Sequence, residues 1–212
     1  MKKIISLILI VGIFVFSFAS CKDNEQSNTS SQTVSAQKSE IVKLAEKGEI
    51  GNVEYKISDA IDTIYNDYDR DSNGNLKDNV SEDIDRYFNA KEKDGVSMID
   101  TGKARYYYKT SNKESGVTCI ADYNDAYDFH VGLTYTSDVR EDVGIEPKEE
   151  KTVFDPNSSN AVKPAFYKAT PVESVYMISY EIDKYVLSFY FEKDLLTATV
   201  LYDAVEWSDY EQ

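Results

Sequence analysis

Oxygen-bearing side chains recur at alternate positions between residues 69 and 75, with Gly74 among them. They are Asp69, Asp71, Asn73 and Asn75. Calcium prefers several hard oxygen ligands around one ion, and a glycine permits the sharp turn that such a loop needs. The sequence therefore predicts a calcium site here. The alternative is an Asn-Gly turn between two helices, decorated with solvated acids.

This segment resembles the first eight positions of an EF-hand calcium loop, with oxygen ligands at positions 1, 3 and 5, Gly74 at position 6 and Leu76 at position 8. It departs from that family at Lys77 in position 9 and at Val80 in position 12, where the family has a bidentate Glu. The resemblance implies that a later acid, Glu82 or Asp83, would have to supply the missing ligand in a longer loop. Such an ion could be structural and unrelated to activity.

The N-terminus carries a second chemical signal. Met1-Lys2-Lys3 is positively charged, an uncharged and mostly apolar stretch extends from Ile4 to Phe18, and small residues precede Cys21. This order is typical of a secretory signal peptide. The apolar stretch is shorter than the roughly 20 residues that a membrane-spanning helix needs.

Phe18-Ala19-Ser20-Cys21 resembles the lipobox of bacterial lipoproteins, with Phe18 in place of the usual Leu. The resemblance implies that residues 1–20 are removed and that Cys21 carries diacylglycerol and further acyl chains such as palmitate. The protein would then be anchored by lipid on the extracytoplasmic face of the cell membrane and presented at the cell surface. The alternative is an ordinary cleaved signal with a chance cysteine. Residues 21–37 are polar and predict a flexible tether.

Other reactive side chains give weaker signals. With Cys21 lipidated, Cys119 has no partner for an internal disulfide, and its apolar neighbours predict a buried, inert thiol. His130 lies on the same polar face of an expected strand as Asp128 and could pair with it, although a solvated or hydrogen-bonded surface histidine is the favoured interpretation. No nucleophile motif accompanies the pair, so the sequence nominates no catalytic residue and favours a protein that is not an enzyme.

Tyrosine is abundant, with 17 residues, three of them consecutive at Tyr106, Tyr107 and Tyr108. Consecutive strand residues point to opposite faces, so at least one of the three should face away from the core. We therefore predict ligand contact at Tyr106–Tyr108, because exposed tyrosines bind sugars and proteins well. The alternative is that they fill cross-strand pairs within the sheet.

The excess of negative charge argues against one class of partner, nucleic acid. Lys and Arg number 23 against 38 Asp and Glu, which gives a net charge of −15. Binding to nucleic acid needs clustered positive charge, so we expect no nucleic-acid partner. One histidine and two cysteines also argue against a zinc site built from those residues.

The elements that must position these residues follow from hydrophobic periodicity. Helices are predicted from Ser39 to Lys47, after Ser58 and over 81–91, because apolar residues recur at helical spacing behind capping residues. Alternation predicts strands over 104–110, 116–123, 127–135, 174–181, 185–191 and 195–202. The order predicts an α+β fold, with N-terminal short helices packed on a mainly antiparallel sheet of about six strands.

We expect residues 38–212 to form a single domain. Residues 137–164 break the pattern and predict a long irregular segment with one short strand at Thr152-Val153-Phe154. For the function, two hypotheses remain. The first is a lipid-anchored binding or interaction module for an extracellular protein or glycan. The second is a hydrolase of glycans or cell wall that uses paired carboxylates.

Overall fold

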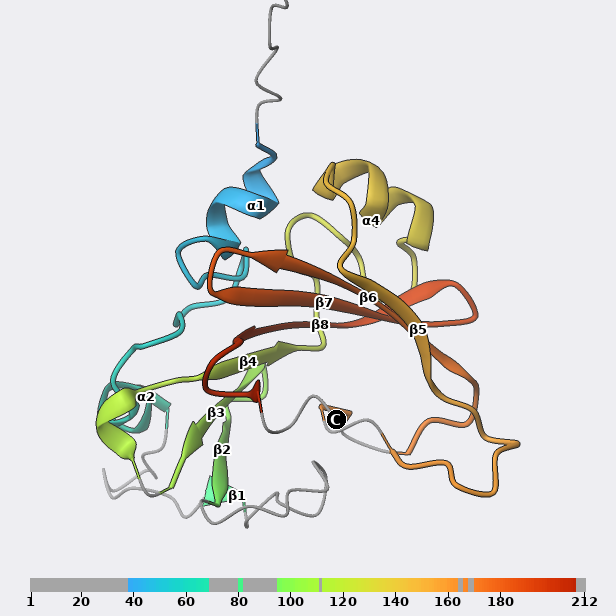
Figure 1. Cartoon of the computed structure of the whole chain (residues 1–212). Helices are drawn as coiled ribbons and strands as arrows, with labels where there is room; N and C mark the ends of the chain where they lie inside the picture. The colour runs from blue at the N-terminus through green and yellow to red at the C-terminus, as the bar shows by residue number, and fades with distance from the viewer. Residues whose placement is uncertain are drawn as a thin grey trace, which may run out of the picture. The chain divides into compact units, whose positions relative to one another are not determined.

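One antiparallel sheet organises the fold, which we describe from a computed structural model (Figure 1). The structure describes residues 38–68, 80–81, 95–110, 112–163, 166–167 and 170–208. Within these ranges the strands are β1 (Val80–Ser81), β2 (Val96–Asp100), β3 (Ala104–Lys109), β4 (Cys119–Asp122), β5 (Glu149–Phe154), β6 (Val175–Ile182), β7 (Tyr185–Glu192) and β8 (Leu195–Asp203). Their spatial order is β1-β2-β3-β4-β8-β7-β6-β5. A first meander, β1 to β4, and a second meander, β6 to β8, therefore meet at one seam, where β4 pairs with β8.

The second meander follows the sequence prediction closely. Tight turns join β6 to β7 and β7 to β8. The β6–β7 register runs without interruption from Ile182↔Tyr185, and the β7–β8 register shifts once, between Tyr190 and Phe191. Both residues of the second turn have positive φ, 52° at Lys193 and 68° at Asp194. Turns of this handedness match the right-handed twist of paired strands, which is why two residues suffice.

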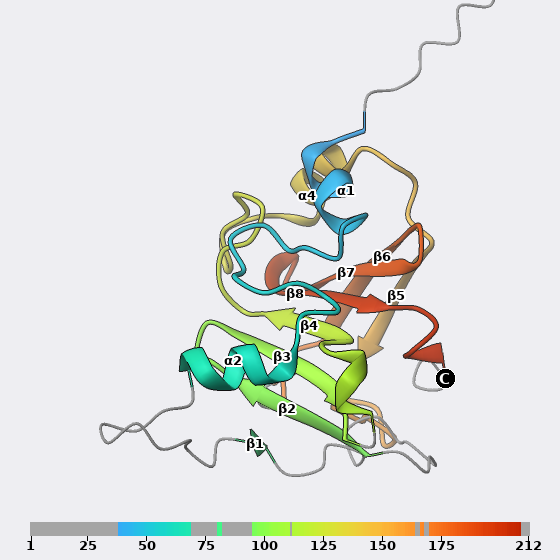
Figure 2. The same ribbon diagram turned by 90° about the vertical axis from the view of Figure 1, so that its left-hand side faces the viewer.

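The helices are few and short: α1 (Glu40–Ala45), α2 (Ile61–Tyr68), α4 (Thr136–Val143) and the 3-10 turn η1 (Lys113–Ser115). The Ser39 side chain caps α1 by accepting from the Val42 N–H. The same hydroxyl donates to the Val143 carbonyl at 3.0 Å. This bond ties the start of α1 to the end of α4, and the two helices lie side by side (Figure 2).

Both faces of the sheet are covered by apolar residues. Tyr106 and Tyr108 belong to the larger core, which they share with residues of α1, α2 and α4. Tyr107 points to the opposite face and belongs to a second core with Phe166 and Trp207, which come from segments outside the strands. A sheet buried on both faces reads as continuous hydrophobic strands, and β7 is buried at seven consecutive positions.

The coarse fold class is confirmed, since the described residues form a mainly antiparallel sheet with few short helices. Two local predictions are wrong. Residues 127–135 form turns with isolated bridges at Phe129 and Tyr135, because Tyr127, Asp128 and Gly132 take positive φ and break the strand. The segment 137–164 is not irregular throughout, since it contains most of α4 and all of β5.

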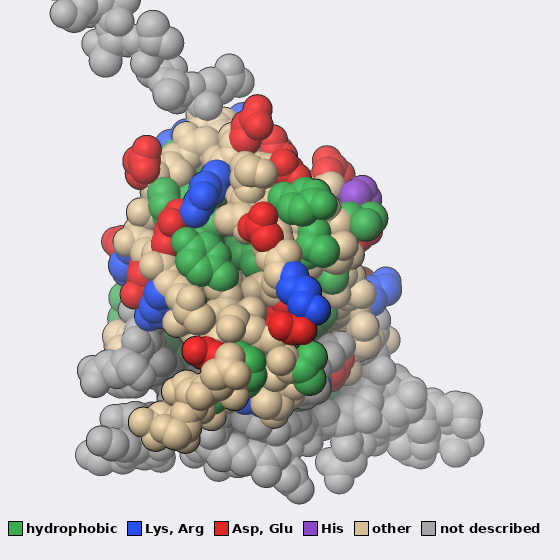
Figure 3. Space-filling view, turned by 90° about the vertical axis from the view of Figure 1, so that its right-hand side faces the viewer, with side chains coloured by type: hydrophobic (Ala, Val, Ile, Leu, Met, Phe, Trp, Pro, Cys, Tyr) green, Lys and Arg blue, Asp and Glu red, His purple; other side chains and the backbone are tan. Residues whose placement is uncertain are grey.

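Strand β5 forms one edge of the sheet and is exposed at its first four positions. Charged side chains there pair with neighbours, as in Lys151–Glu149 at 2.9 Å and the contact from Arg140 of α4 to Glu150 at 2.8 Å. The surface seen from this side shows acidic and basic side chains interspersed among hydrophobic ones (Figure 3). Charges on an edge strand oppose its pairing with another chain.

Candidate functional site

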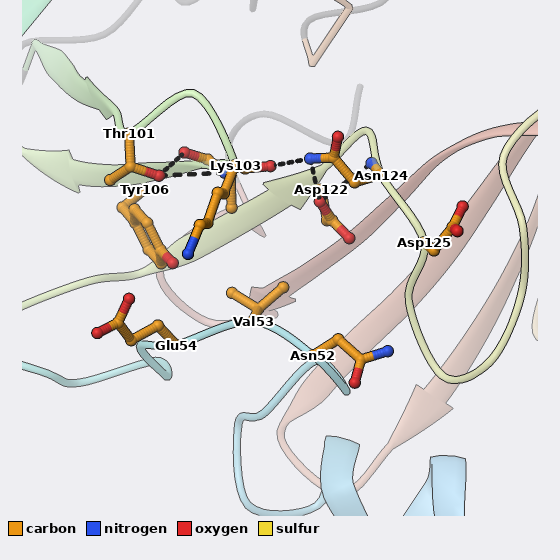
Figure 4. Close-up of a pocket in the computed structure, with 10 residues that line it drawn as sticks. Asn52, Val53, Glu54, Thr101, Lys103, Tyr106, Asp122, Asn124 and Asp125 are labelled. Atoms are coloured by element: carbon orange, nitrogen blue, oxygen red, sulfur yellow. Dashed lines mark hydrogen bonds between the residues drawn. The ribbon is translucent and has the colours of Figure 1, made fainter.

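A pocket of about 220 Å³ opens where three segments meet, on the face of the sheet that carries Tyr106 and the larger core. The first segment precedes α2, the second runs from the β2–β3 turn into β3, and the third lies at the end of β4 (Figure 4). The lining residues are Asn52, Val53, Glu54, Thr101, Lys103, Ala104, Tyr106, Asp122, Asn124 and Asp125. Carboxylate, amide, ammonium and hydroxyl groups thus gather around a partly apolar space.

The β2–β3 turn fixes one wall. The Asp100 carboxylate accepts from the Gly102 N–H at 2.8 Å and from Arg105 Nε at 2.8 Å. Gly102 has a φ of +80°, a conformation that side chains disfavour, so glycine suits the turn. The turn places Lys103 at its end, directly before β3.

Asp122 is the most unusual residue of the pocket. Ile120 faces the larger core, and alternation puts the Asp122 side chain on the same face, where the residue is only 3% exposed. Its Oδ1 accepts from the backbone N–H of Asn124 at 3.1 Å and from Asn124 Nδ2 at 3.2 Å. Burial raises the pKa of Asp122, and these hydrogen bonds oppose the rise.

Asn124 braces the site. Besides Asp122, its side-chain amide donates to the Lys103 carbonyl, so one side chain links the end of β4 to the β2–β3 turn. Figure 4 shows this bridge across the top of the pocket. The bridge holds the Asp122 carboxylate and the Lys103 backbone in fixed relation.

Asp122 and Lys103 form no ion pair with any described residue. Within the described ranges, no Lys, Arg or His forms an ion pair with Asp122, and no acid lies within 4 Å of Lys103 Nζ. Both side chains point from the sheet toward the 52–54 segment (Figure 4). A buried carboxylate without a counter-charge is costly, so Asp122 is suited to receive one from a ligand.

Thr199 adds a second under-satisfied group. It is the cross-strand neighbour of Asp122 in β8 and is fully buried. Its Oγ1 has no hydrogen-bond partner among the residues that the structure describes. Buried hydroxyls are ordinarily paired, so this spot beside Asp122 has unused hydrogen-bonding capacity.

Asp125 has the opposite environment to Asp122. It is exposed, and its two carboxylate oxygens accept from His130 Nδ1 at 2.8 Å and from the Val131 N–H at 3.0 Å. The hydrogen bond from His130 is the main cause that lowers the pKa of Asp125. His130 is thus a hydrogen-bonded surface histidine, as expected, but its partner is Asp125 and not Asp128, because the turn at 127–133 brings Asp125 to the imidazole.

The prediction of exposed tyrosines at 106–108 is also wrong. Tyr106 is 2% exposed, and Tyr107 and Tyr108 are 1% exposed. Tyr107 does face away from the larger core, as alternation requires, but Phe166 and Trp207 cover it in edge-on ring contacts. Of the three, Tyr106 alone lines the pocket.

Cys119 is fully buried, as predicted. Burial raises the pKa of its thiol well above the ordinary value, which keeps the thiol protonated and unreactive. Trp207, at the other end of the chain, is 2% exposed and donates from Nε1 to the Thr118 carbonyl at 3.1 Å.

The other predicted sites lie outside the described residues. This holds for Cys21, for Asp69, Asp71, Asn73 and Asn75, and for Glu82. In the ranges that are described, no cluster of three or more Asp, Glu, His or Cys is placed to hold a metal ion. None of the helices described is long and apolar enough to cross a membrane.

Sequence reasoning did not find the pocket. The one available signal was Asp122, a charged residue two positions after Ile120 and hence in phase with the buried face of a strand. Asn52, Lys103 and Asn124 gave no such signal, because isolated polar residues in connections are ordinary surface residues.

Comparisons with known proteins add little. No protein-family model matches the chain, and no curated protein matches it. Among solved structures, the chain is similar to the crystal structure of a DUF4309 family protein (YjgB) from Bacillus subtilis subsp. subtilis str. 168. The similarity covers 77% of this chain and 93% of that one, at 12% identity and a TM-score of 0.43.

Proposed function

We propose that this protein is a lipid-anchored extracytoplasmic binding module and that the pocket around Asp122 is its ligand site. The observation that carries the binding role is a carboxylate, 3% exposed, that lines the pocket and forms no ion pair with any described residue. In this proposal the short helices pack on one face of the sheet, and the segment between α1 and α2 forms one wall of the pocket. A volume below the 300–1,000 Å³ of drug-sized pockets suits a small ligand or one unit of a polymer.

The anchor rests on the sequence alone. Acylation of Cys21 would hold the protein on the membrane, since buried acyl chains contribute about 0.8 kcal/mol per methylene. Expression of the full chain in a bacterium with labelled palmitate tests this. Label should enter the wild type and a Cys119→Ala control and be absent from Cys21→Ala. Equal labelling of Cys21→Ala would contradict the anchor.

Ligand binding is tested on the detergent-solubilised full chain. We expect the melting temperature to rise with at least one member of a panel of monosaccharides, amino acids and short peptides, because a ligand that binds only the folded state stabilises it. The rise should disappear in Asp122→Asn and persist in Asp183→Asn, a charge-matched change in the β6–β7 turn. The absence of any rise across the panel would contradict a small-ligand role for this pocket.

A hydrolase is the second candidate, and one observation favours it. Asp122 and Asp125 line the same pocket, and their environments move their pKa values in opposite directions. In glycoside hydrolysis, two carboxyl groups with different pKa values serve as the general acid and as the base or nucleophile. In this role Asp122 would donate the proton and Asp125 would remain ionised.

Turnover distinguishes the two candidates. A hydrolase should release product from cell-wall glycan or from a nitrophenyl glycoside, and both Asp122→Asn and Asp125→Asn should abolish release. Ligand binding without turnover by the wild type leaves the binding module and removes the hydrolase.

A further inference from the structure

The pocket presents two opposite charges to the same space. Lys103 Nζ and the Asp122 carboxylate come from neighbouring segments of the sheet and both point toward residues 52–54 (Figure 4). Within the described ranges neither has an ion-pair partner within 4 Å, and they do not pair with each other. The space between them belongs to whatever the pocket holds.

The other charged residues of the pocket contribute less. Asp125 already accepts from His130 and from a backbone N–H through both of its oxygens. Glu54 is exposed to solvent, as is Lys103. Asp122, at 3% exposure, is the buried acid, so a ligand interacts with it in the least screened part of the pocket.

From this geometry we infer that the pocket binds a small zwitterion, with an ammonium group at Asp122 and a carboxylate at Lys103, as in a free α-amino acid. The inference rests on the proposed binding function and names its ligand class. An ammonium group supplies the counter-charge that Asp122 lacks, and a carboxylate does the same for Lys103. Thr199, the cross-strand neighbour of Asp122, has a buried hydroxyl without a described partner and lies behind the lining of the pocket rather than in it.

Other ligand classes fit less well. An anion without an ammonium group would be repelled by the negative charge of Asp122, and a diamine would be repelled by the positive charge of Lys103. A neutral sugar could hydrogen-bond to both groups and would leave the buried carboxylate without a counter-charge. The apolar part of the lining, Val53, Ala104 and the Tyr106 ring, offers contact to an aliphatic side chain.

Calorimetry on the detergent-solubilised full chain tests the inference, with free amino acids assayed one at a time at about 10 mM, far above an ordinary dissociation constant. At least one should bind, and its N-acetyl and amide derivatives should each bind about tenfold more weakly or worse, because each loses a charge-assisted hydrogen bond. Asp122→Asn and Lys103→Gln should have the same effect. Asp183→Asn and Lys193→Gln, which change the same charges in hairpin turns, should bind like the wild type.

Four outcomes would overturn the inference. The first three are binding of the N-acetyl derivative as tightly as the free amino acid, no binding of any amino acid, and wild-type affinity in Lys103→Gln. Glucose and galactose are assayed beside the amino acids. A sugar that binds in the wild type and not in Asp122→Asn would refute the zwitterion while leaving the binding function intact. Melting temperatures without ligand show whether each variant is folded.

Discussion

Trp207 offers a direct test of the second core. The side chain is 2% exposed, packs edge-on against Tyr107 at a ring distance of 6.2 Å, and contacts Phe166 at 5.9 Å. Replacing a buried tryptophan by alanine removes this contact area and leaves a cavity, which typically costs about 3–5 kcal/mol. For a domain of this size each kcal/mol lowers the melting temperature by about 2–4 °C, so Trp207→Ala should melt about 6–20 °C lower.

The hydrogen bond of the indole contributes little of that loss. The Thr118 carbonyl accepts from Trp207 Nε1 at 3.1 Å and also from the Asp203 N–H at 3.0 Å, so it keeps a partner when the indole is removed. Trp207→Phe retains a buried ring and should therefore be destabilised clearly less than Trp207→Ala. Its loss consists of about 0.5–1.5 kcal/mol for the hydrogen bond, plus the effect of the smaller ring volume.

Urea unfolding of the full chain, followed by circular dichroism, gives the free energy of unfolding for each variant. Val205→Ala is the matched control, because Val205 lies in the same segment and is 75% exposed. It should stay within about 0.5 kcal/mol of the wild type. A loss below about 1 kcal/mol in Trp207→Ala would refute the claim that this face of the sheet is a packed core.

Three further changes have defined outcomes. Gly116→Ala should lower the free energy of unfolding in urea by at least about 2 kcal/mol, because φ is +71° and the new Cβ would lie 2.5 Å from a backbone oxygen. Gly102→Ala, where the new Cβ meets nothing within 4 Å, should lower it by only about 1–2 kcal/mol, through conformational strain alone. Equal losses in the two variants would contradict the clash at Gly116. Burial raises the pKa of Asp122 above its ordinary 3.8, so ionisation opposes folding above that pH, and the urea midpoint of Asp122→Asn should exceed that of the wild type by a margin that grows from about pH 4 to pH 7; a margin independent of pH would contradict this. Millimolar calcium should raise the melting temperature of the full chain, by up to about 2.7 kcal/mol of stabilisation at a hundred times Kd, and Asp69→Ala and Asp71→Ala should abolish the rise; calorimetry without a shift in the wild type removes the calcium site.

The sequence predicted those elements that depend on residues close together in the chain. The strands of the second meander were predicted within two residues of their ends, because alternation and two-residue turns coincide there. Helix α1 was predicted from its Ser39 cap. These features depend on neighbours in sequence, which is the information that a single chain carries most clearly.

The errors arose where the tertiary structure overrides local pattern. Residues 127–135 alternate like a strand, yet three positive φ values turn the chain there. Exposure was predicted for at least one tyrosine of Tyr106–Tyr108, because the segments that cover this face of the sheet, with Phe166 and Trp207, lie far away in sequence. The pocket was missed for the same reason, since Asn52, Lys103 and Asp122 meet only when the sheet is assembled.

The seam between β4 and β8 has a consequence for how the chain folds. Its four paired positions, from Cys119↔Tyr202 to Asp122↔Thr199, join residues about 80 positions apart, and such distant pairing slows folding. The first meander therefore lacks its neighbouring strand until β8, about 80 residues further along the chain, has been synthesised. The same seam pairs Asp122 with Thr199, so β8 holds in place the strand that carries the buried acid of the pocket.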